Sequence, residues 1–251
     1  MCLVVLAIDR HPDYPLILAA NRDEFHARPA REAHWWQDKP QVFGGRDLQA
    51  GGTWLATSRN GRFATVTNFQ DVKPSSPDHR SRGFLVTDFL DGELAPRDYL
   101  ATIEQGEYSG FNLIVGTPGD VGYLTNRGDE MRALGPGLYG LSNAFLDGPW
   151  YKVERTRDRL ATLLDAGDIS ATSLVRLMGD RERAPAERVV TGNLDFERAH
   201  AISAPFIVTP DYGTRCTSVI LADRDGGWRF LERRFDASGE AIGDIEVNYQ
   251  L

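Results

Sequence analysis

Residues 1–25 carry the sequence MCLVVLAIDRHPDYPLILAANRDEF, and this stretch decides the predicted fold. Two short apolar runs, residues 2–8 and 16–20, flank a segment rich in proline and aspartate, which favours a turn. We therefore predict an N-terminal β-hairpin, with residues 21–24 just beyond its second strand. Because the two strands of a hairpin are antiparallel neighbours, Cys2 and residues 21–24 are expected to meet in space.

Cys2 directly follows the initiator methionine, which methionine aminopeptidases generally remove when the next residue is small. The chain would then begin with a residue that carries both a thiol and a free α-amine. Their ordinary pKa values are about 8.5 and about 7.7–8.0. Such a residue supplies a nucleophile and its own base, so no histidine is needed. The alternative is an ordinary cysteine at a frayed terminus.

The composition is that of a soluble globular protein, with 41% hydrophobic and 25% charged residues among 251. We expect one domain, 1–251, without a transmembrane segment, because no apolar run approaches the roughly 20 residues needed to span a bilayer. The net charge of −8 argues against a nucleic-acid partner. With only Cys2 and Cys216, no disulfide framework is implied, so a reducing compartment such as the cytoplasm is expected.

The order of the remaining patterns is strands, then helices, then strands, which favours an α+β fold with antiparallel sheets. Asn60–Gly61 is a strong hairpin turn signal, and it places Asn68 at a strand end. Residues 71–82 are predicted to form a surface loop, and residues 179–199 an Arg-rich lid or excursion. Helices are predicted at 84–92, 149–166 and 170–178, and strands at 2–8, 16–20, 53–58, 62–68, 111–116, 121–125, 205–208, 214–222, 228–235 and 245–249.

Polar side chains gather at the predicted strand ends, namely Asn21, Arg22, Asp23, Glu24, Asn68, Asn143 and Arg215. Taken singly, each is typical of a turn, a cap or a solvated surface. Phosphate-loop, G-x-S-x-G and zinc-ligand spacings are missing from the sequence, so neither a cofactor nor a metal is expected.

Several spaced segments, ANRDEFHARPA, GGRDLQAGGTWLA, GRFATVTNFQD, SRGFLVTDFL, GLSNAFLDGPWYKV and YGTRCTSVILAD, resemble the NRDE-motif family, which includes the transport-and-Golgi-organisation proteins of eukaryotes. The resemblance runs from Cys2 to about Glu232. It implies an N-terminal-nucleophile hydrolase fold, a four-layer αββα sandwich with two antiparallel sheets. Links of family members to lipid homeostasis and haem trafficking imply lipid or haem as alternative partners.

A more distant resemblance, to choloylglycine hydrolases and penicillin V acylases, implies the chemistry. Cys2 would attack the carbonyl carbon, and its α-amine would take the thiol proton. Asp23 would hold the amine, while Asn143 with Asn68 would donate to the oxyanion. Arg215 would lower the pKa of the thiol or bind a carboxylate. Substrate contacts are expected from Asn21, Arg22, Glu24, Trp54 and Phe69, and an apolar acyl pocket from Trp35, Trp36, Trp54, Phe69, Phe145 and Trp150.

One position departs from that pattern. Those enzymes carry an arginine three residues before the aspartate, where this sequence has Ala20. Arg22 is the nearest substitute, and we expect it to point to the opposite side of the extended chain. Three functions therefore stay open: an amidohydrolase or acyltransferase acting on a small acylated compound, a non-catalytic carrier of lipid or haem, and an interaction protein in membrane traffic.

Overall fold

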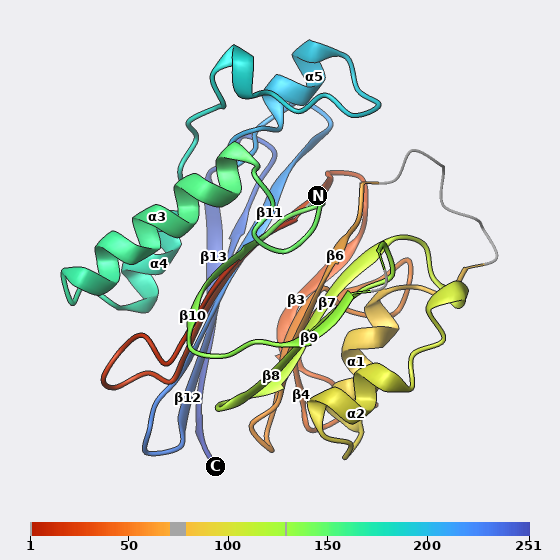
Figure 1. Ribbon diagram of the computed structural model, residues 1–251, viewed down its shortest axis with the longest axis vertical. Helices are drawn as coiled ribbons and strands as arrows, with labels where there is room; N and C mark the ends of the chain where they lie inside the picture. The colour runs from red at the N-terminus through yellow and green to blue at the C-terminus, as the bar shows by residue number, and fades with distance from the viewer. Residues whose placement is uncertain (1, 71–78, 129) are drawn as a thin grey trace.

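The computed structural model describes residues 2–70, 79–128 and 130–251. These residues form two antiparallel β-sheets packed face to face, with helices on both outer sides (Figure 1). The predicted α+β class and the four-layer αββα arrangement are confirmed. Within the described part of the chain, no helix combines the length and the apolar character needed to cross a membrane.

The first sheet holds both chain ends and has the strand order β10-β1-β2-β11-β12-β13. Every neighbouring pair in it is antiparallel. The N-terminal hairpin forms as predicted and lies near the middle of this sheet. Its strands are β1 (Cys2–Ile8), β2 (Leu16–Phe25), β10 (Gly137–Leu141), β11 (Tyr212–Ala222), β12 (Gly227–Phe235) and β13 (Ala241–Gln250).

The second sheet follows the chain in order, from β3 to β9, as an antiparallel meander. Its strands are β3 (Ala30–Trp35), β4 (Val42–Asp47), β5 (Leu55–Ser58), β6 (Phe63–Asn68), β7 (Phe111–Thr117), β8 (Asp120–Thr125) and β9 (Glu130–Ala133). The predicted turn at Asn60–Gly61 joins β5 to β6, and Gly61 takes the positive φ of 73° that such a turn requires. Asn68 ends β6, as expected.

Two groups of helices cover the outer faces (Figure 1). α1 (Gly83–Asp91) and α2 (Pro96–Ala101) pack on the second sheet, and α3 (Tyr151–Asp165) and α4 (Ala171–Met178) pack on the first. Three short elements complete the described structure: η1 (Gln105–Glu107), η2 (Ala186–Arg188) and α5 (Phe196–Ala201). The last two belong to the segment that was predicted as an excursion.

Alternation along β1 and β2 sends successive side chains into two different cores. Even-numbered residues such as Val4 and Leu18 pack between the two sheets. Odd-numbered residues such as Val5 and Ala19 pack under α3 and α4. Both strands are therefore buried on both faces, which explains why they read as continuous apolar runs and not as alternating ones.

Two sequence-based expectations differ from the structure. β2 continues through residues 21–24, so the NRDE segment is part of a central strand and does not lie beyond it. Residues 205–208 form no strand, and only Val208 makes an isolated bridge. Most of the predicted loop at 71–82 lies outside the described residues. β3, β4, β9, β10 and α2 were not predicted, because each is only four to six residues long and carries little periodicity.

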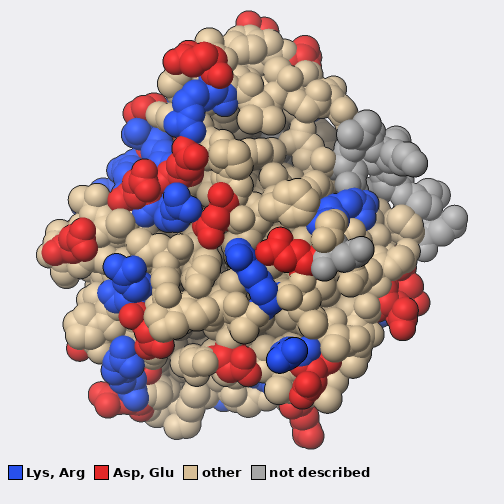
Figure 2. Space-filling view, viewed as in Figure 1, with Lys and Arg blue, Asp and Glu red and all other residues tan. Residues whose placement is uncertain are grey.

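Acidic and basic side chains are interspersed over the face shown in Figure 2. The net negative charge is therefore not gathered into one large acidic patch on this side of the molecule.

Gly52 fixes the start of α1 against the second sheet. A Cβ built on Gly52 would lie 2.5 Å from the main-chain carbonyl carbon of Gly83, which is the first residue of α1. The Thr53 N–H also donates to the Gly83 carbonyl at 3.4 Å. Only glycine permits this approach, so Gly52 serves close packing.

Substituting Gly52→Ala is expected to lower the free energy of unfolding by about 1–3 kcal/mol, because the methyl group forces two backbones apart. The matched control is Gly106→Ala, where an added Cβ meets nothing within 4 Å. That variant should stay within about 0.5 kcal/mol of the wild type. Urea denaturation compares the two, and equal losses would contradict the packing argument.

Candidate active site

Cys2 stands at the beginning of β1, in register with the end of β2. Cys2 pairs with Arg22, and on the other side of β2 Arg22 pairs with Cys216. Residues directly opposite each other on antiparallel strands point to the same face. The side chains of Cys2 and Arg22 therefore both face the layer between the two sheets.

A cavity of about 660 Å³ opens at this end of the sheet sandwich. Its walls come from both sheets and from the segment that leads into α1. Polar and charged groups dominate the lining, which comprises Cys2, Arg22, Asp23, Glu24, Phe25, Arg28, Asp47, Gln49, Ala50, Gly52, Thr53, Trp54, Val66, Asn68, His79, Arg80, Ser81, Arg82, Gly83 and Ser109.

Opposing influences act on the Cys2 thiol. Burial raises its pKa above the ordinary value, and the negative charge of Asp23 adds to the rise. The backbone N–H of Asp23 donates to the sulfur and, together with the Arg22 guanidinium, favours the thiolate. Arg22 is thus the cation that the structure sets beside the sulfur.

Asp23 is buried beside Cys2, at the end of β2. The hydroxyl of Thr214 on β11 donates to its Oδ1 at 2.7 Å, and the hydroxyl of Tyr212 donates to its backbone carbonyl at 2.8 Å. Burial raises the pKa of this carboxyl, and the positive charge of Lys152 opposes the rise most strongly among its neighbours. The hairpin therefore brings Cys2 and Asp23 together, as its antiparallel pairing predicts.

Asn68 and Asn143 lie side by side but have different surroundings. The Asn143 side-chain amide donates to the Asn68 carbonyl at 2.6 Å. Ser142 links the same loop to the reactive strand, since its hydroxyl donates to the Cys2 carbonyl at 2.8 Å. Asn68 lines the cavity, whereas Asn143 is buried behind it. Asn68 is thus the side chain with access to a bound molecule, and Asn143 supports it.

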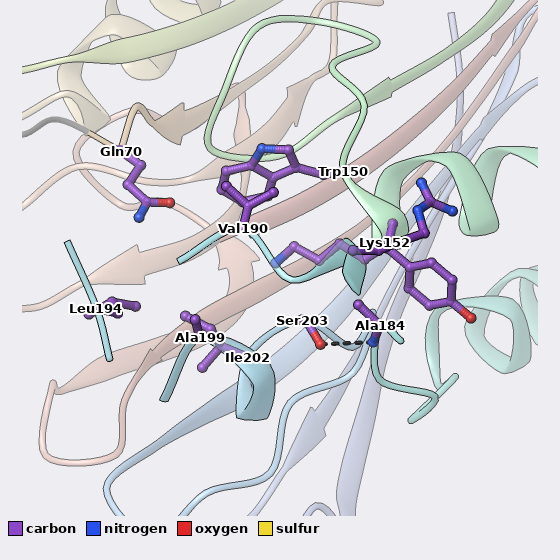
Figure 3. Close-up of a pocket in the computed structure, with 11 residues that line it drawn as sticks. Gln70, Trp150, Lys152, Ala184, Val190, Leu194, Ala199, Ile202 and Ser203 are labelled. Atoms are coloured by element: carbon purple, nitrogen blue, oxygen red, sulfur yellow. Dashed lines mark hydrogen bonds between the residues drawn. The ribbon is translucent and has the colours of Figure 1, made fainter. Parts of the chain in front are cut away.

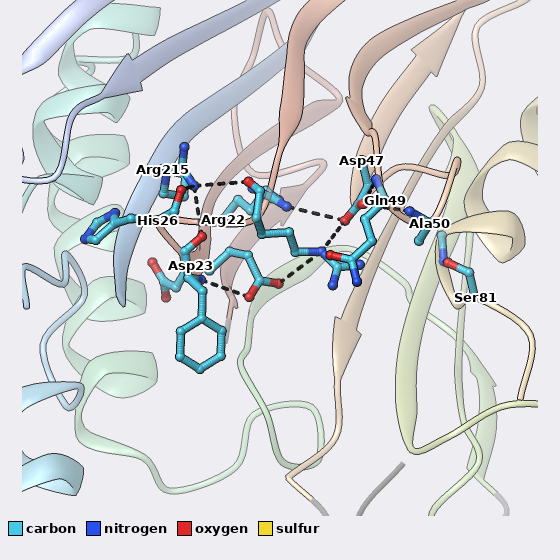
Figure 4. A network of polar contacts seen from close by, with 12 residues as sticks. Arg22, Asp23, His26, Asp47, Gln49, Ala50, Ser81 and Arg215 are labelled. Carbon is cyan, nitrogen blue, oxygen red and sulfur yellow. Dashed lines mark hydrogen bonds and ion pairs between the residues drawn. The ribbon is translucent and has the colours of Figure 1, made fainter. Parts of the chain in front are cut away.

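Arg22 belongs to a charged network on the cavity wall (Figure 4). It lies 3.5 Å from the Asp47 carboxylate, and its guanidinium carbon lies 4.3 Å from the Trp54 ring centroid. Arg28 binds the same carboxylate at 2.7 Å. The expectation that Arg22 points to the opposite side was wrong. Residues 20 and 22 of one strand share a face, so Arg22 extends from the same side of β2 as Ala20 and toward Cys2.

Arg215 does not reach the thiol, in contrast to the role suggested by the resemblance. It is the extra residue of a β-bulge in β11, between Thr214 and Cys216. Its guanidinium donates to the backbone carbonyls of Phe25 and His26 at 3.0 and 3.1 Å (Figure 4). The bulge turns the side chain toward the turn after β2, so we assign Arg215 to holding that turn.

Asn21 is also separated from the cavity. Its amide nitrogen donates to the carbonyls of Met178 and Pro205, both at 2.9 Å, and its oxygen accepts from the Thr217 hydroxyl at 2.6 Å. All of these partners lie on the side of the sheet covered by helices. The asparagine therefore ties β2 to the segments around α4 and is not placed to touch a substrate in the cavity.

The aromatic residues do not gather into one apolar pocket. Of the six aromatic residues expected to form an acyl pocket, only Trp54 lines the large cavity. Glu24, one of the expected substrate contacts, lines it too. Phe69 instead packs edge-on against Phe145, at 5.1 Å between ring centroids. Trp36 is buried under the outer helices. The polar cavity lining takes the place of the expected apolar one.

Lys152 is a site residue that the sequence gave no reason to single out. It lies in the first turn of α3, is 2% exposed, and its nitrogen has no hydrogen-bond partner among the described residues. Desolvation lowers its pKa, and Asp23 and Cys2 act against this. A lysine at the start of an amphipathic helix normally predicts a solvated position. Thr214 and Tyr212 were likewise missed, because they act only through tertiary contact.

Glu232 occupies the sheet interface near Cys216. Its Oε1 accepts a hydrogen bond from the Ala33 N–H at 2.8 Å, so it links β12 to β3 across the two sheets. Its Oε2 has no hydrogen-bond partner within the described part of the chain. Burial raises the pKa of Glu232, and burial together with Glu232 raises that of Cys216 well above its usual value. Cys216 does not line the cavity, so it is a matched internal comparison for Cys2.

The pKa of Glu232 predicts a pH-dependent stability difference. A carboxyl whose pKa is higher in the folded state contributes stability below its unfolded pKa, and this is lost as pH rises through the folded pKa. Glu232→Gln should therefore gain stability relative to the wild type as pH rises above the ordinary pKa of a glutamate, about 4.3, by about 1.4 kcal/mol per unit of pKa shift. Urea denaturation across this range measures it. A pH-independent difference between Glu232→Gln and the wild type would refute the assignment.

Clusters of three or more histidine, cysteine, aspartate or glutamate side chains that could hold a metal ion do not occur among the described residues. The Cys2 thiol is instead surrounded by the Asp23 carboxylate, the Asn68 amide and the Arg22 guanidinium group.

Comparison with known proteins identifies relatives over nearly the whole chain. Residues 1–237 match the model of the family described as Transport and Golgi organisation 2. The Transport and Golgi organization protein 2 homolog of Bos taurus is 38% identical, with 93% of this chain and 92% of that protein aligned. The Homo sapiens homolog is 35% identical with the same coverage.

Among solved structures, a mutant of the conjugated bile acid hydrolase from Clostridium perfringens has the same fold. The two structures agree with a TM-score of 0.53 over 100% of this chain and 97% of that one, at 8% sequence identity. At this level of identity the similarity concerns the fold, which is that of the N-terminal-nucleophile hydrolases.

Proposed function

Because the chain belongs to the Transport and Golgi organisation 2 family and has the N-terminal-nucleophile hydrolase fold, we propose that it is an N-terminal cysteine amidohydrolase or acyltransferase. Its substrate would be a small acylated compound, cleaved at a C–N bond. The observation that carries this proposal is the meeting of Cys2 with Asp23 at the wall of a cavity of about 660 Å³. That volume suits a small molecule.

Acylation would begin once Met1 has been removed. The Cys2 thiol transfers its proton to its own α-amine, and the sulfur forms a bond to the carbonyl carbon of the substrate. The carbonyl π electrons move to the oxygen, which becomes an oxyanion. When the oxyanion collapses, the C–N bond breaks and the leaving nitrogen takes the proton from the α-ammonium. The product of this half-reaction is a thioester on Cys2.

Deacylation repeats the steps with water or an acceptor nucleophile. The α-amine takes a proton from the attacking molecule, the C–S bond breaks, and the thiol is regenerated together with the free acid or the transferred acyl group. Asp23 supports both halves by holding the α-ammonium. Thr214 keeps the carboxylate in place through the 2.7 Å hydrogen bond.

Asn68 is the proposed oxyanion donor. Its side chain lines the cavity, and Asn143 fixes its backbone through the 2.6 Å hydrogen bond to its carbonyl. Such a preorganised donor is worth about 3–4 kcal/mol in the barrier. This assignment divides the role that the resemblance gave to both asparagines, with Asn68 donating and Asn143 positioning.

Arg22 is proposed to take over the part of the arginine that is absent at Ala20. It faces the same layer as Cys2 and favours the thiolate, and its stacking on Trp54 holds it in place. The neighbouring Arg28 and the carboxylates of Asp47 and Glu24 make the wall polar. We therefore expect a substrate with a polar or charged portion beside its acyl group.

A screen of N-acyl amides tests the proposal. Purified protein whose mass shows loss of Met1 is incubated with acyl amides of varied chain length and varied amine. The expected result is release of the amine together with a mass increase on Cys2 that matches the acyl group. Saturable binding of lipid or haem that persists in Cys2→Ala, without turnover of any amide, would favour the carrier function instead.

We further propose that the whole chain, 1–251, acts as one domain in a reducing compartment such as the cytoplasm. The observation in support is that Cys2 and Cys216 are both free thiols.

A further inference from the structure

Lys152 is a buried cation on the far side of Asp23 from the large cavity. Its side chain runs inward from α3 and ends in a small hollow between Trp150 and Ala199 (Figure 3). The hollow has a volume of about 30 Å³, which is room for one or two water molecules. The lysine nitrogen lies 5.9 Å from the centre of the Trp150 ring and has no hydrogen-bond partner in the described chain.

An ammonium group in such a place is costly unless a negative charge compensates it. The walls of the hollow are largely apolar, with Val190, Leu194 and Ile202 among them. The charges that favour the ammonium are those of Asp23 and Cys2, and Lys152 is in turn the foremost cationic neighbour of Asp23. The side chain is therefore tied electrostatically to the reactive end of β1.

This arrangement follows from the two faces of β2. Even residues such as Arg22 face the cavity, and the next residue, Asp23, reaches the side on which α3 packs. Asp23 thus lies on the cavity wall and also under the electrostatic influence of Lys152. The α-amine of Cys2 would approach it from the strand end, and Lys152 approaches it from the helix layer.

We propose that Lys152 is a positioning residue for the reaction proposed above: it shares the Asp23 carboxylate with the α-amine of Cys2 and thereby keeps that amine in its neutral, proton-accepting form. A carboxylate beside an amine favours the protonated amine, which cannot serve as a base. A second cation on the same carboxylate weakens this effect. Lys152 thus tunes the base without touching the substrate, and the inference rests on the proposed function.

Other charged groups near this position must be included in any account of its titration. They are Arg22, Asp23 and Glu24 from β2, Cys2 from β1, Tyr212 from β11, and Arg188, which lines the hollow from η2 and pairs with Glu154 of α3. Removing the charge of Lys152 leaves the cavity wall unchanged, because Lys152 is absent from the cavity lining.

The test compares Lys152→Met, which keeps an unbranched side chain of similar size and removes its charge, with Lys152→Arg, which keeps the charge. The rate at which iodoacetamide alkylates Cys2 is followed against pH by peptide mass spectrometry, on protein that has lost Met1. In Lys152→Met the midpoint of the alkylation profile should move up by about one pH unit. The reason is that loss of a nearby positive charge raises the pKa of the thiol and of the α-ammonium. In Lys152→Arg the midpoint should stay close to that of the wild type, because the positive charge is kept.

The alkylation profile separates the two proposals, since it does not require turnover. If Lys152→Met shifts the alkylation midpoint but the wild type hydrolyses no amide, the proposed function is contradicted. The electrostatic role of Lys152 then still stands. An unchanged midpoint in an active enzyme would overturn the role of Lys152 alone. In an active enzyme the acidic limb of kcat/KM should move by the same amount as the alkylation midpoint.

A second measurement covers a Lys152→Met variant that does not fold. The sequence has three lysines, Lys39, Lys73 and Lys152, so ¹³C-labelled lysine gives three signals, which Lys39→Arg and Lys73→Arg assign. In Asp23→Asn the titration midpoint of Lys152 should fall, because its counter-charge is gone. A midpoint that does not change would overturn the proposed sharing of the carboxylate.

Discussion

Replacing Cys2 by alanine is expected to abolish amide hydrolysis, with a loss of roughly 10⁴-fold or more in kcat/KM. The reason is that the thiol forms the covalent bond to the acyl group in the proposed reaction. Alanine is small, so removal of Met1 should continue. The hydroxyl of Ser142 bonds to the backbone of residue 2, so it should hold β1 equally well in the variant.

The control for this experiment is Cys216→Ala. Cys216 pairs with the same Arg22 from the opposite side and is buried, but it does not line the cavity. Its variant should keep activity within a few-fold of the wild type. Thermal unfolding of both variants should give similar midpoints. Hydrolysis that survives in Cys2→Ala would end the case for an N-terminal nucleophile.

Replacing Asp23 by asparagine is expected to lower kcat by about 10²–10³-fold with a small effect on KM. An orienting carboxylate acts mainly in the transition state, because it stabilises the cation that forms when the base takes the proton. The asparagine can still accept the hydrogen bond from Thr214, so the geometry of β2 and β11 should persist. Steady-state kinetics on the best amide of the screen measures the effect.

The companion variant is Thr214→Val, which removes the hydroxyl that holds the carboxylate but keeps its charge. Its loss should be about tenfold, well below that of Asp23→Asn. If Asp23→Asn instead raised KM and left kcat unchanged, Asp23 would be a binding group for substrate and not the holder of the amine.

The N-terminal hairpin and the meeting of Cys2 with Asp23 were predictable from the sequence. Both depend on local strand patterns and a turn, and antiparallel pairing then fixes which residues lie opposite each other. Asn68 was also placed correctly, because the Asn60–Gly61 turn sets the length of the strand that it ends.

The roles of Arg22, Arg215 and Lys152 were not predictable in the same way. A single β-bulge at Arg215 changes which side of β11 its side chain leaves, and no residue pattern announces such a bulge. Arg22 shares a face with Ala20, because alternate residues of a strand point to the same side. The influence of Lys152 on Asp23 depends on how α3 packs against β1, and the two residues are 129 positions apart in the sequence.

The most direct test of the central claim is the chemical state of the N-terminus in protein purified from its own host. Intact mass should show a chain that begins at Cys2, and 2-cyanobenzothiazole, which condenses with an adjacent thiol and amine, should add once to the wild type and to Cys216→Ala but not to Cys2→Ala. A population that retains Met1 throughout and gives no adduct would contradict the account, because Cys2 would then lack the amine that serves as its base.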